Sequence, residues 1–203
     1  MSDDRQDQVL ALAGIAWSLL FVGARIGLVV AMARVGTVVG GMFAVSEALS
    51  LAFTVRGLWR GVLCGGPLSF LVPVFYVMPL CLRPVAGHVV PVLAGCLLAL
   101  ACVGQVALRL YLWHFVSVGV PVYQGVVSSG PYRFVKHPLA ACELVIVASF
   151  VCCYPTWWNV GVGCLAIAAG VCAALFEEAF LRCFSDYRSY SDQVPDRFFY
   201  GII

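Results

Sequence analysis

The chain alternates long apolar stretches with short polar segments along its whole length. A transmembrane helix needs about 20 mostly apolar residues. Stretches that meet this requirement, at least approximately, lie at Val9–Ala33, Thr37–Val55, Gly61–Leu82, His88–Trp113, Leu139–Cys153 and Trp158–Phe176. The pattern therefore predicts an all-α, polytopic membrane helical bundle of about six transmembrane segments. The third stretch contains three prolines, so a five-span bundle with a re-entrant third segment is the alternative.

The composition indicates the same class. Hydrophobic residues make up 63% of the 203 residues and charged residues 11%, with a mean hydropathy of +0.99. Soluble domains have about 25% charged residues, so that class is excluded. The length suits a single membrane domain, 1–203, and the net charge of +2 is too small for a nucleic-acid-binding surface. The sequence leaves the oligomeric state open.

The ten cysteines do not indicate a metal site. Most of them lie inside apolar stretches, where cysteine packs as a small hydrophobic residue. No pair of C-x-x-C motifs at metal-binding spacing occurs, and we expect no metal.

The distribution of basic residues predicts the orientation of the bundle, because cytoplasmic loops carry an excess of lysine and arginine. With the N-terminus inside, nine basic residues lie on the inner side: Arg5, Arg56, Arg60, Arg109, Arg133, Lys136, Arg182, Arg188 and Arg197. The outer side holds two, Arg34 and Arg83. We therefore expect a multi-pass integral membrane protein with both termini and its polar site on the cytoplasmic face.

Two charged residues, Arg25 and Glu47, fall within the first two predicted spans. Each is costly alone inside a membrane. On antiparallel helices they would lie at similar depth, so an ion pair between the two helices is one interpretation. A role in a substrate pocket is the other.

One long polar segment, Ser128–Pro138, interrupts the apolar pattern with the sequence SSGPYRFVKHP. It combines two hydroxyls, a Gly-Pro turn, a phenol, two cations and an imidazole. Such a segment is costly at membrane depth unless it lies at the interface or lines a cavity within the protein. We expect it to form one wall of a cofactor site.

A second polar cluster begins with Glu177-Glu178, at the predicted inner end of the last span. Successive helical side chains point about 100° apart, so the two carboxylates should face different ways, and Glu178 can pair with Arg182. Anions at a helix C-terminus need a compensating cation, which a positively charged ligand could supply. A solvated helix end is the simpler interpretation. Because the hairpin Leu139 to Phe176 joins the two polar clusters, we expect them at the same membrane face and close together.

These residues resemble the isoprenylcysteine carboxyl methyltransferase and phospholipid methyltransferase family of integral membrane enzymes. The matching residues are Gly130-Pro131-Tyr132-Arg133, Lys136-His137-Pro138, Glu143, Glu177-Glu178-x-x-Leu181, Phe184, Asp186-Tyr187 and Tyr190. The resemblance covers about residues 104–200, so 104–203 is expected to be the catalytic half. The helices of 1–103 have no assigned role.

The resemblance implies S-adenosylmethionine as methyl donor and a lipophilic small-molecule or lipid-modified acceptor that enters from the surrounding membrane lipids. The residues expected to bind the donor are Gly130, Tyr132, Arg133, Lys136, His137, Pro138, Leu139, Glu143, Glu177 and Glu178. The residues expected to act in catalysis are Glu178, His137 and Arg182, the last as the cation that orients the acceptor. Prenylcysteine, a phospholipid amine, a thiol and an isoprenoid metabolite all fit as acceptors.

The chain departs from the family pattern at three places. Lys136 replaces the usual arginine, Ala140 a common tyrosine, and Ala173 or Ala174 an arginine often found before the paired glutamates. An alternative function is an NADPH-dependent membrane ene-reductase of the sterol and steroid reductase type, which has a related His-Pro pattern. Those enzymes typically have asparagine and tyrosine where this chain has Leu139 and Ala140. A third interpretation is a non-catalytic membrane scaffold.

Overall fold

The computed structural model describes residues 81–85, 87–112 and 125–201, together with 41, 44, 45 and 48. Within these residues the secondary structure is helical and contains no strand. The elements are α4 (Val92–Leu112), the short 3-10 helix η2 (Gly130–Arg133), α5 (Pro138–Cys153), α6 (Trp157–Leu181) and α7 (Ser185–Gln193). The predicted all-α class is confirmed for this part of the chain.

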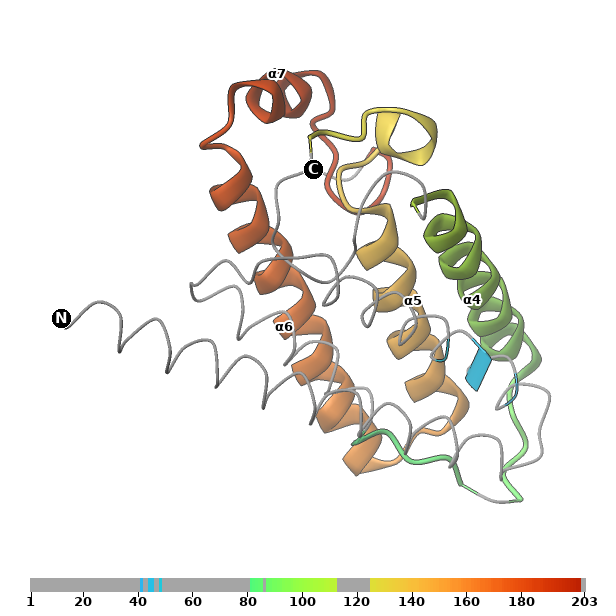
Figure 1. Ribbon diagram of the computed structural model, residues 1–203. Helices are drawn as coiled ribbons and strands as arrows, with labels where there is room; N and C mark the ends of the chain where they lie inside the picture. Colours follow the sequence, from blue (N-terminus) through green and yellow to red (C-terminus); the bar gives the residue numbers. More distant parts are fainter. Residues whose placement is uncertain are drawn as a thin grey trace, which may run out of the picture.

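Three long helices lie side by side, with α5 between α4 and α6 and packed against both (Figure 1). The short link from α5 to α6 lies at one end of these helices, and η2 and α7 lie at the other end. The 21-residue α4 and the 25-residue α6 are long and apolar enough to cross a membrane, whereas α5 has 16 residues. Two of the described helices are thus candidate membrane spans by length and composition, and the six-span bundle stays a prediction.

Local sequence explains where α5 and α6 begin. Pro138 is the first residue of α5, a position at which the missing N–H of proline costs no helical hydrogen bond. Thr156 caps α6, because its Oγ1 accepts a hydrogen bond from the Asn159 N–H at 3.1 Å. The last predicted span, Trp158–Phe176, lies within α6, which continues to Leu181. The paired glutamates are therefore in the last turns of this helix, where the sequence placed them.

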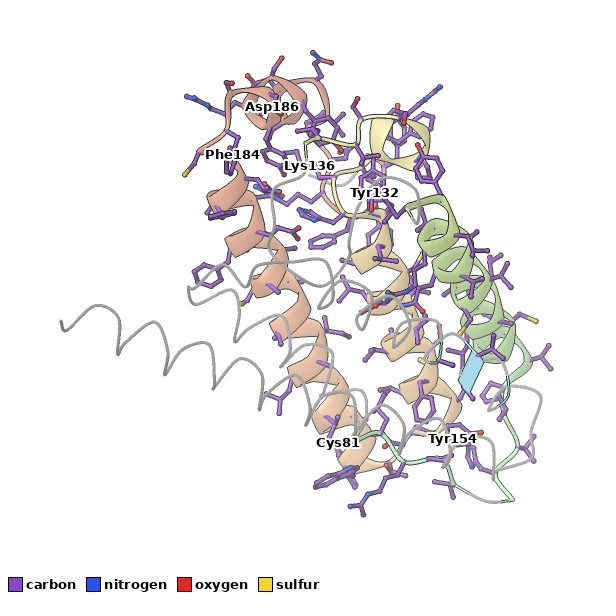
Figure 2. The ribbon with its side chains drawn as sticks, viewed as in Figure 1. Cys81, Tyr132, Lys136, Tyr154, Phe184 and Asp186 are labelled. Carbon is purple, nitrogen blue, oxygen red and sulfur yellow. The ribbon has the colours of Figure 1, made fainter. Side chains whose placement is uncertain are left out.

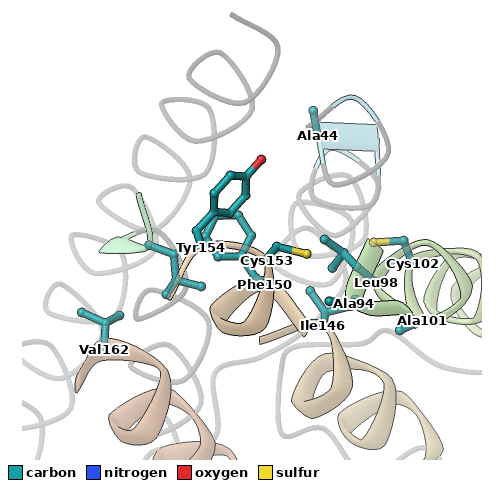
Figure 3. Packing of buried hydrophobic residues seen from close by; sticks show 11 residues of the cluster. Ala44, Ala94, Leu98, Ala101, Cys102, Ile146, Phe150, Cys153, Tyr154 and Val162 are labelled. Carbon is teal, nitrogen blue, oxygen red and sulfur yellow. The ribbon is translucent and has the colours of Figure 1, made fainter. Parts of the chain in front are cut away.

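The interface between α4 and α5 forms the largest apolar core. Leu98, Ala101 and Cys102 of α4 are in one buried cluster with Ile146 and Phe150 of α5 (Figure 3). Large apolar side chains are also exposed on the outward faces of α4 and α6, namely Val92, Leu93, Leu100, Val103, Leu110, Leu165, Leu175 and Phe176. Apolar surface on both sides of a helix is typical of helices surrounded by lipid.

The neutral amide of Asn159 holds together the backbone at the end of the bundle farthest from η2. Asn159 is fully buried, accepts a hydrogen bond from the Arg83 N–H at 2.9 Å and donates to the Arg83 and Tyr154 carbonyls at 2.9 and 2.8 Å. Trp158 Nε1 donates to the Cys81 carbonyl at 2.7 Å. Tyrosine and tryptophan at a helix connection are typical of a membrane–water interface.

The two ends of the bundle carry different chemistry. Figure 2 shows Lys136 and Asp186 at one end and Cys81 at the opposite end. The helical rise places Asn159 and Glu178 about 28 Å apart along α6, close to the hydrocarbon thickness of a bilayer of about 30 Å. The amide and the carboxylate thus lie near opposite ends of a membrane-length helix.

Several predictions fall outside the described residues. These are the span Val9–Ala33 and nearly all of Thr37–Val55 and Gly61–Leu82, with Arg25 and Glu47. Residues 41, 44, 45 and 48, within the second of these spans, are helical. The interpretation of the Arg25 and Glu47 pair stays open.

Gly163 allows α5 and α6 to approach closely. A Cβ atom at this position would lie 2.5 Å from Val151 Cγ2 and 3.7 Å from Val147 Cγ1. Gly163→Ala must displace the valine or separate the helices, and we expect it to lower the free energy of unfolding by about 1–3 kcal/mol. Denaturant titration in detergent micelles, followed by circular dichroism, measures this loss.

Gly161 is the matched control on the same helix. A Cβ at Gly161 would meet nothing within 4 Å. Because alanine is the better helix former, Gly161→Ala should leave the free energy of unfolding unchanged or raise it by up to about 1 kcal/mol. Equal effects of the two substitutions would contradict the close packing at Gly163.

Candidate functional site

The first wall of the site is η2 with the residues next to it. Gly130 has a φ of +59°, in the left-handed region that favours glycine. A Cβ at Gly130 would also lie 3.0 Å from the Tyr111 hydroxyl, which is hydrogen-bonded to Ser129 Oγ at 2.6 Å. The turn is thereby held against α4, and this contact sets the path of the following residues.

Two residues that were expected to bind the cofactor belong to an apolar cluster beside this turn. Leu139 is buried with Leu108 of α4, and Tyr132 packs against the same cluster. The Tyr132 carbonyl accepts a hydrogen bond from the Tyr190 hydroxyl of α7 at 2.7 Å. Burial, with a smaller contribution from the charge of Glu178, raises the pKa of Tyr190 to about 12, so this phenol stays a donor. The turn is thus fixed to both α4 and α7.

The C-terminal tail pairs with the residues just before α5. The Lys136 N–H donates to the Asp196 carbonyl at 2.9 Å, and the His137 N–H donates to the Arg197 carbonyl at 2.8 Å. The Asp196 carboxylate accepts a hydrogen bond from the Gly201 N–H at 3.0 Å. These bonds place the tail beside the polar segment.

The carboxylate of Glu178 is the centre of the site, and its side chain is only 4% exposed. Oε1 accepts a hydrogen bond from Arg197 Nε at 3.1 Å and lies 3.3 Å from His137 Nε2. Oε2 lies 3.8 Å from Lys136 Nζ and 3.9 Å from the guanidinium of Arg182. One carboxylate therefore connects the polar segment, α6 and the tail, and the predicted proximity of the two polar clusters is confirmed.

The paired glutamates face different environments, as helical geometry predicts. The side chain of Glu177 is 54% exposed, whereas that of Glu178 is buried. His137 nevertheless approaches both carboxylates, because its Nδ1 lies 3.8 Å from Glu177 Oε2. The imidazole, itself buried, lies between them.

The chain supplies its own compensating cations. Lys136, Arg182 and Arg197 all approach Glu178, so the helix end does not require the positively charged ligand that the sequence suggested. Lys136 is buried, and burial lowers the pKa of its ammonium group. The cations Arg197 and Arg182 lower this pKa further, while the carboxylates of Glu178 and Asp192 oppose the shift.

One buried polar atom near these carboxylates, the Tyr187 hydroxyl, has no hydrogen-bond partner within the described part of the chain, and Tyr187 is 5% exposed. Burial raises the pKa of Tyr187, and the nearby charges of Glu178 and Glu177 raise it further. An unsatisfied buried polar group costs about 1–3 kcal/mol, so a ligand that bonds to this hydroxyl gains affinity from it.

Glu143 lies in a separate polar cluster between α4 and α5. Its Oε1 accepts hydrogen bonds from the Arg109 guanidinium at 2.7 Å and from Gln105 Nε2 at 2.8 Å. All three side chains are buried. Arg109, taken in the sequence as a topology signal, belongs to a buried ion pair. This geometry gives Glu143 a role in pairing the helices, and its assignment to the cofactor stays a prediction.

The remaining assigned residues lie at the edge of the site. Arg133 is exposed, with its guanidinium carbon 4.5 Å from the ring centroid of Phe134, and the Arg182 side chain is 56% exposed. The sequence did not indicate that Arg197 contacts Glu178, because nothing but its positive charge pointed to the site. Tyr187 was matched in the resemblance but was not assigned to a ligand.

Removing one partner of the buried Arg109–Glu143 pair should be strongly destabilising. Glu143→Gln removes the charge that pairs with the buried Arg109 guanidinium, and we expect a loss of about 3–5 kcal/mol in the free energy of unfolding. The double variant Arg109→Met, Glu143→Met should recover most of this loss, because neither charge then remains buried. Denaturant titration in micelles compares the three proteins. A double variant as unstable as Glu143→Gln would contradict the pairing.

Lys136 should make stability depend on pH. Its pKa is lower in the folded protein than its usual value of 10.5, so unfolding takes up a proton between these two values. Stability therefore rises with pH across this window, by up to about 1.4 kcal/mol per pH unit. We expect the wild type to gain stability relative to Lys136→Met as the pH approaches 10.5, in denaturant titrations at several pH values. A difference that stays constant or falls with pH would contradict the buried ammonium.

Compared with family models, with curated proteins and with solved structures, the chain matches none of them.

Proposed function

We propose that the chain is a membrane methyltransferase that uses S-adenosylmethionine as donor and methylates a lipophilic acceptor. The observation that carries the proposal is the buried Glu178 carboxylate, which His137 Nε2 approaches to 3.3 Å, together with the buried Tyr187 hydroxyl nearby, which has no hydrogen-bond partner among the described residues. These residues belong to the two segments that resemble the methyltransferase family. A purely structural cluster gains nothing from leaving buried donors and acceptors unsatisfied.

The chemistry of these groups fits the donor. A carboxylate can accept hydrogen bonds from ribose hydroxyls or from an ammonium group, and the imidazole and phenol offer further polar contacts. Lys136 adds a cation for the carboxylate at the amino-acid end of the donor. Lys136, His137, Glu178 and Tyr187 are thus the residues that would hold S-adenosylmethionine, which when bound supplies a methyl group activated by its sulfonium.

The residues of the chain contribute positioning and exclusion of water. Ion pairs from three segments hold Glu178 in place, and a fixed carboxylate orients what it binds. Burial of His137 and Lys136 keeps the site poor in water, which leaves an acceptor nucleophile less solvated. A carboxylate acceptor needs no base. For an amine, thiol or phenol acceptor, Nε2 of His137 is the group in place to take the proton.

The proposal includes a six-span bundle, with five spans as the alternative, and a site at the cytoplasmic face. Two features support it. The end of the bundle that contains the site carries Arg133, Lys136, Arg182, Arg188 and Arg197, and the opposite end carries Arg83 among the described residues, a bias that follows the positive-inside rule. Exposed Leu175 and Phe176 directly precede the paired glutamates and offer an acceptor a path from the lipid.

Titration calorimetry with S-adenosylhomocysteine tests donor binding in nanodiscs. We expect the wild type to bind, with about 10- to 100-fold weaker binding in Glu178→Gln and up to about 10-fold weaker binding in Tyr187→Phe. Tyr200→Phe is the matched control, because Tyr200 is 79% exposed, and it should bind as the wild type does.

Two outcomes would overturn the proposal. One is folded wild-type protein that does not bind S-adenosylhomocysteine. The other is stabilisation by NADPH without any response to S-adenosylmethionine, which would favour the ene-reductase. Circular dichroism of each variant shows whether it is folded.

A further inference from the structure

A patch of aromatic and basic side chains lies at the surface of the same end of the bundle. It consists of Arg133, Phe134, Phe199 and Tyr200, and we call it the aromatic patch. The three aromatic residues are 47%, 42% and 79% exposed, and exposed large apolar groups that gather in one place indicate a binding surface. The Phe134 and Tyr200 rings meet edge to face, with 6.2 Å between their centroids. The end of η2 and the C-terminal tail therefore form this patch together.

Arg133 is the basic residue of the patch. Its guanidinium carbon lies over the Phe134 ring, 4.5 Å from the ring centroid. This cation–π contact uses no hydrogen bond, so the N–H groups of the guanidinium can still donate to an oxygen. Among the described residues no carboxylate pairs with Arg133, whereas the cations of the site approach Glu178. Arg133 thus presents oriented donors to the surroundings of the protein.

The apolar outer surface of the helices extends almost to the level of the patch. Exposed apolar side chains continue along α4 to Leu110 and along α6 to Phe176, within the last two turns of each helix. The turn η2, which Phe134 directly follows, lies at this end of the helices (Figure 1). In a membrane, the layer beyond the last apolar side chains contains the lipid headgroups, and aromatic rings and long basic side chains are typical of it. The composition of the patch fits this layer.

We propose that the aromatic patch binds the phosphate of an anionic phospholipid, with Arg133 as the hydrogen-bond donor and the exposed rings against the glycerol region of the lipid. The guanidinium of arginine can bind a phosphate through two parallel hydrogen bonds, and the Phe134 ring holds it in place for this purpose. A choline headgroup carries a cation of its own, which Arg133 repels, so the patch favours a headgroup with net negative charge. This binding depends on the membrane environment of the bundle and is independent of methyl transfer.

Native mass spectrometry of the protein from mixed micelles tests the proposal in the absence of S-adenosylmethionine. The micelles contain phosphatidylglycerol and phosphatidylcholine in equal amounts, and the measured quantity is the ratio of the two lipids that stay bound. We expect the wild type to retain phosphatidylglycerol in excess. Arg133→Gln should lower the ratio about 5-fold, the factor that one basic residue contributes near an anionic lipid surface. Arg133→Lys keeps the charge but loses the two parallel hydrogen bonds, so its ratio should lie between the two.

Two further variants separate the patch from the net charge of the protein. Phe134→Leu keeps an apolar side chain and removes the ring beneath Arg133, and we expect it to lower the ratio about 2- to 5-fold. Arg188→Gln removes the same charge from an exposed arginine of α7 that contacts no aromatic ring among the described residues. It should change the ratio much less than Arg133→Gln does. Circular dichroism shows that each variant is folded.

Three outcomes would overturn the proposal. They are equal retention of the two lipids by the wild type, an unchanged ratio in Arg133→Gln, and an equal loss in Arg188→Gln, which would show that net charge alone attracts the lipid. A wild type that shows no lipid preference and is a dimer, with the dimer lost in Arg133→Gln, would assign the patch to a second copy of the chain instead. A protein that prefers phosphatidylglycerol but never binds S-adenosylhomocysteine would retain the lipid site and overturn the proposed function.

Discussion

The buried carboxylate of Glu178 is the constraint on which the polar end of the structure depends. A buried charge is costly unless other charges and hydrogen bonds compensate it. Here the compensation comes from the segment before α5 with Lys136, from α6 with Arg182 and from the tail with Arg197. None of these segments satisfies the carboxylate alone. Assembly of the site therefore requires all three to be in place together.

The opposite end of α6 is stabilised by hydrogen bonds between uncharged groups. Asn159 is as deeply buried as Glu178, but its amide is neutral and meets the backbone of Arg83 and Tyr154 with matched donors and acceptors. All three of these hydrogen bonds involve groups with no charge to desolvate, so this end is stable without ions. The ion pairs of Glu178 lie at the other end of α6, near the Tyr187 hydroxyl, which has no hydrogen-bond partner among the described residues.

The sequence predicted the helices because a membrane-length apolar stretch must satisfy its own backbone hydrogen bonds in lipid, and a helix does so within one segment. It also predicted that the two polar clusters meet, because a hairpin returns the chain to the same end. It could not predict which charged residues pair with each other. Charge counting records the sign of Arg109 and Arg197 but not that one pairs with Glu143 and the other with Glu178. Because α5 is apolar on all sides, its pattern did not indicate that Glu143 faces α4.

The charges of the site are nearly balanced. Lys136, Arg182 and Arg197 approach the Glu178 carboxylate, and the carboxylates of Glu177 and Asp192 lie near the same groups. Such a site has no strong preference for a cation or an anion, and a ligand with both kinds of group can meet partners of both signs. The proposed donor, with its carboxylate, sulfonium and ammonium, is such a ligand. Its selection then depends on directional hydrogen bonds, for which the Tyr187 hydroxyl is available among the described residues.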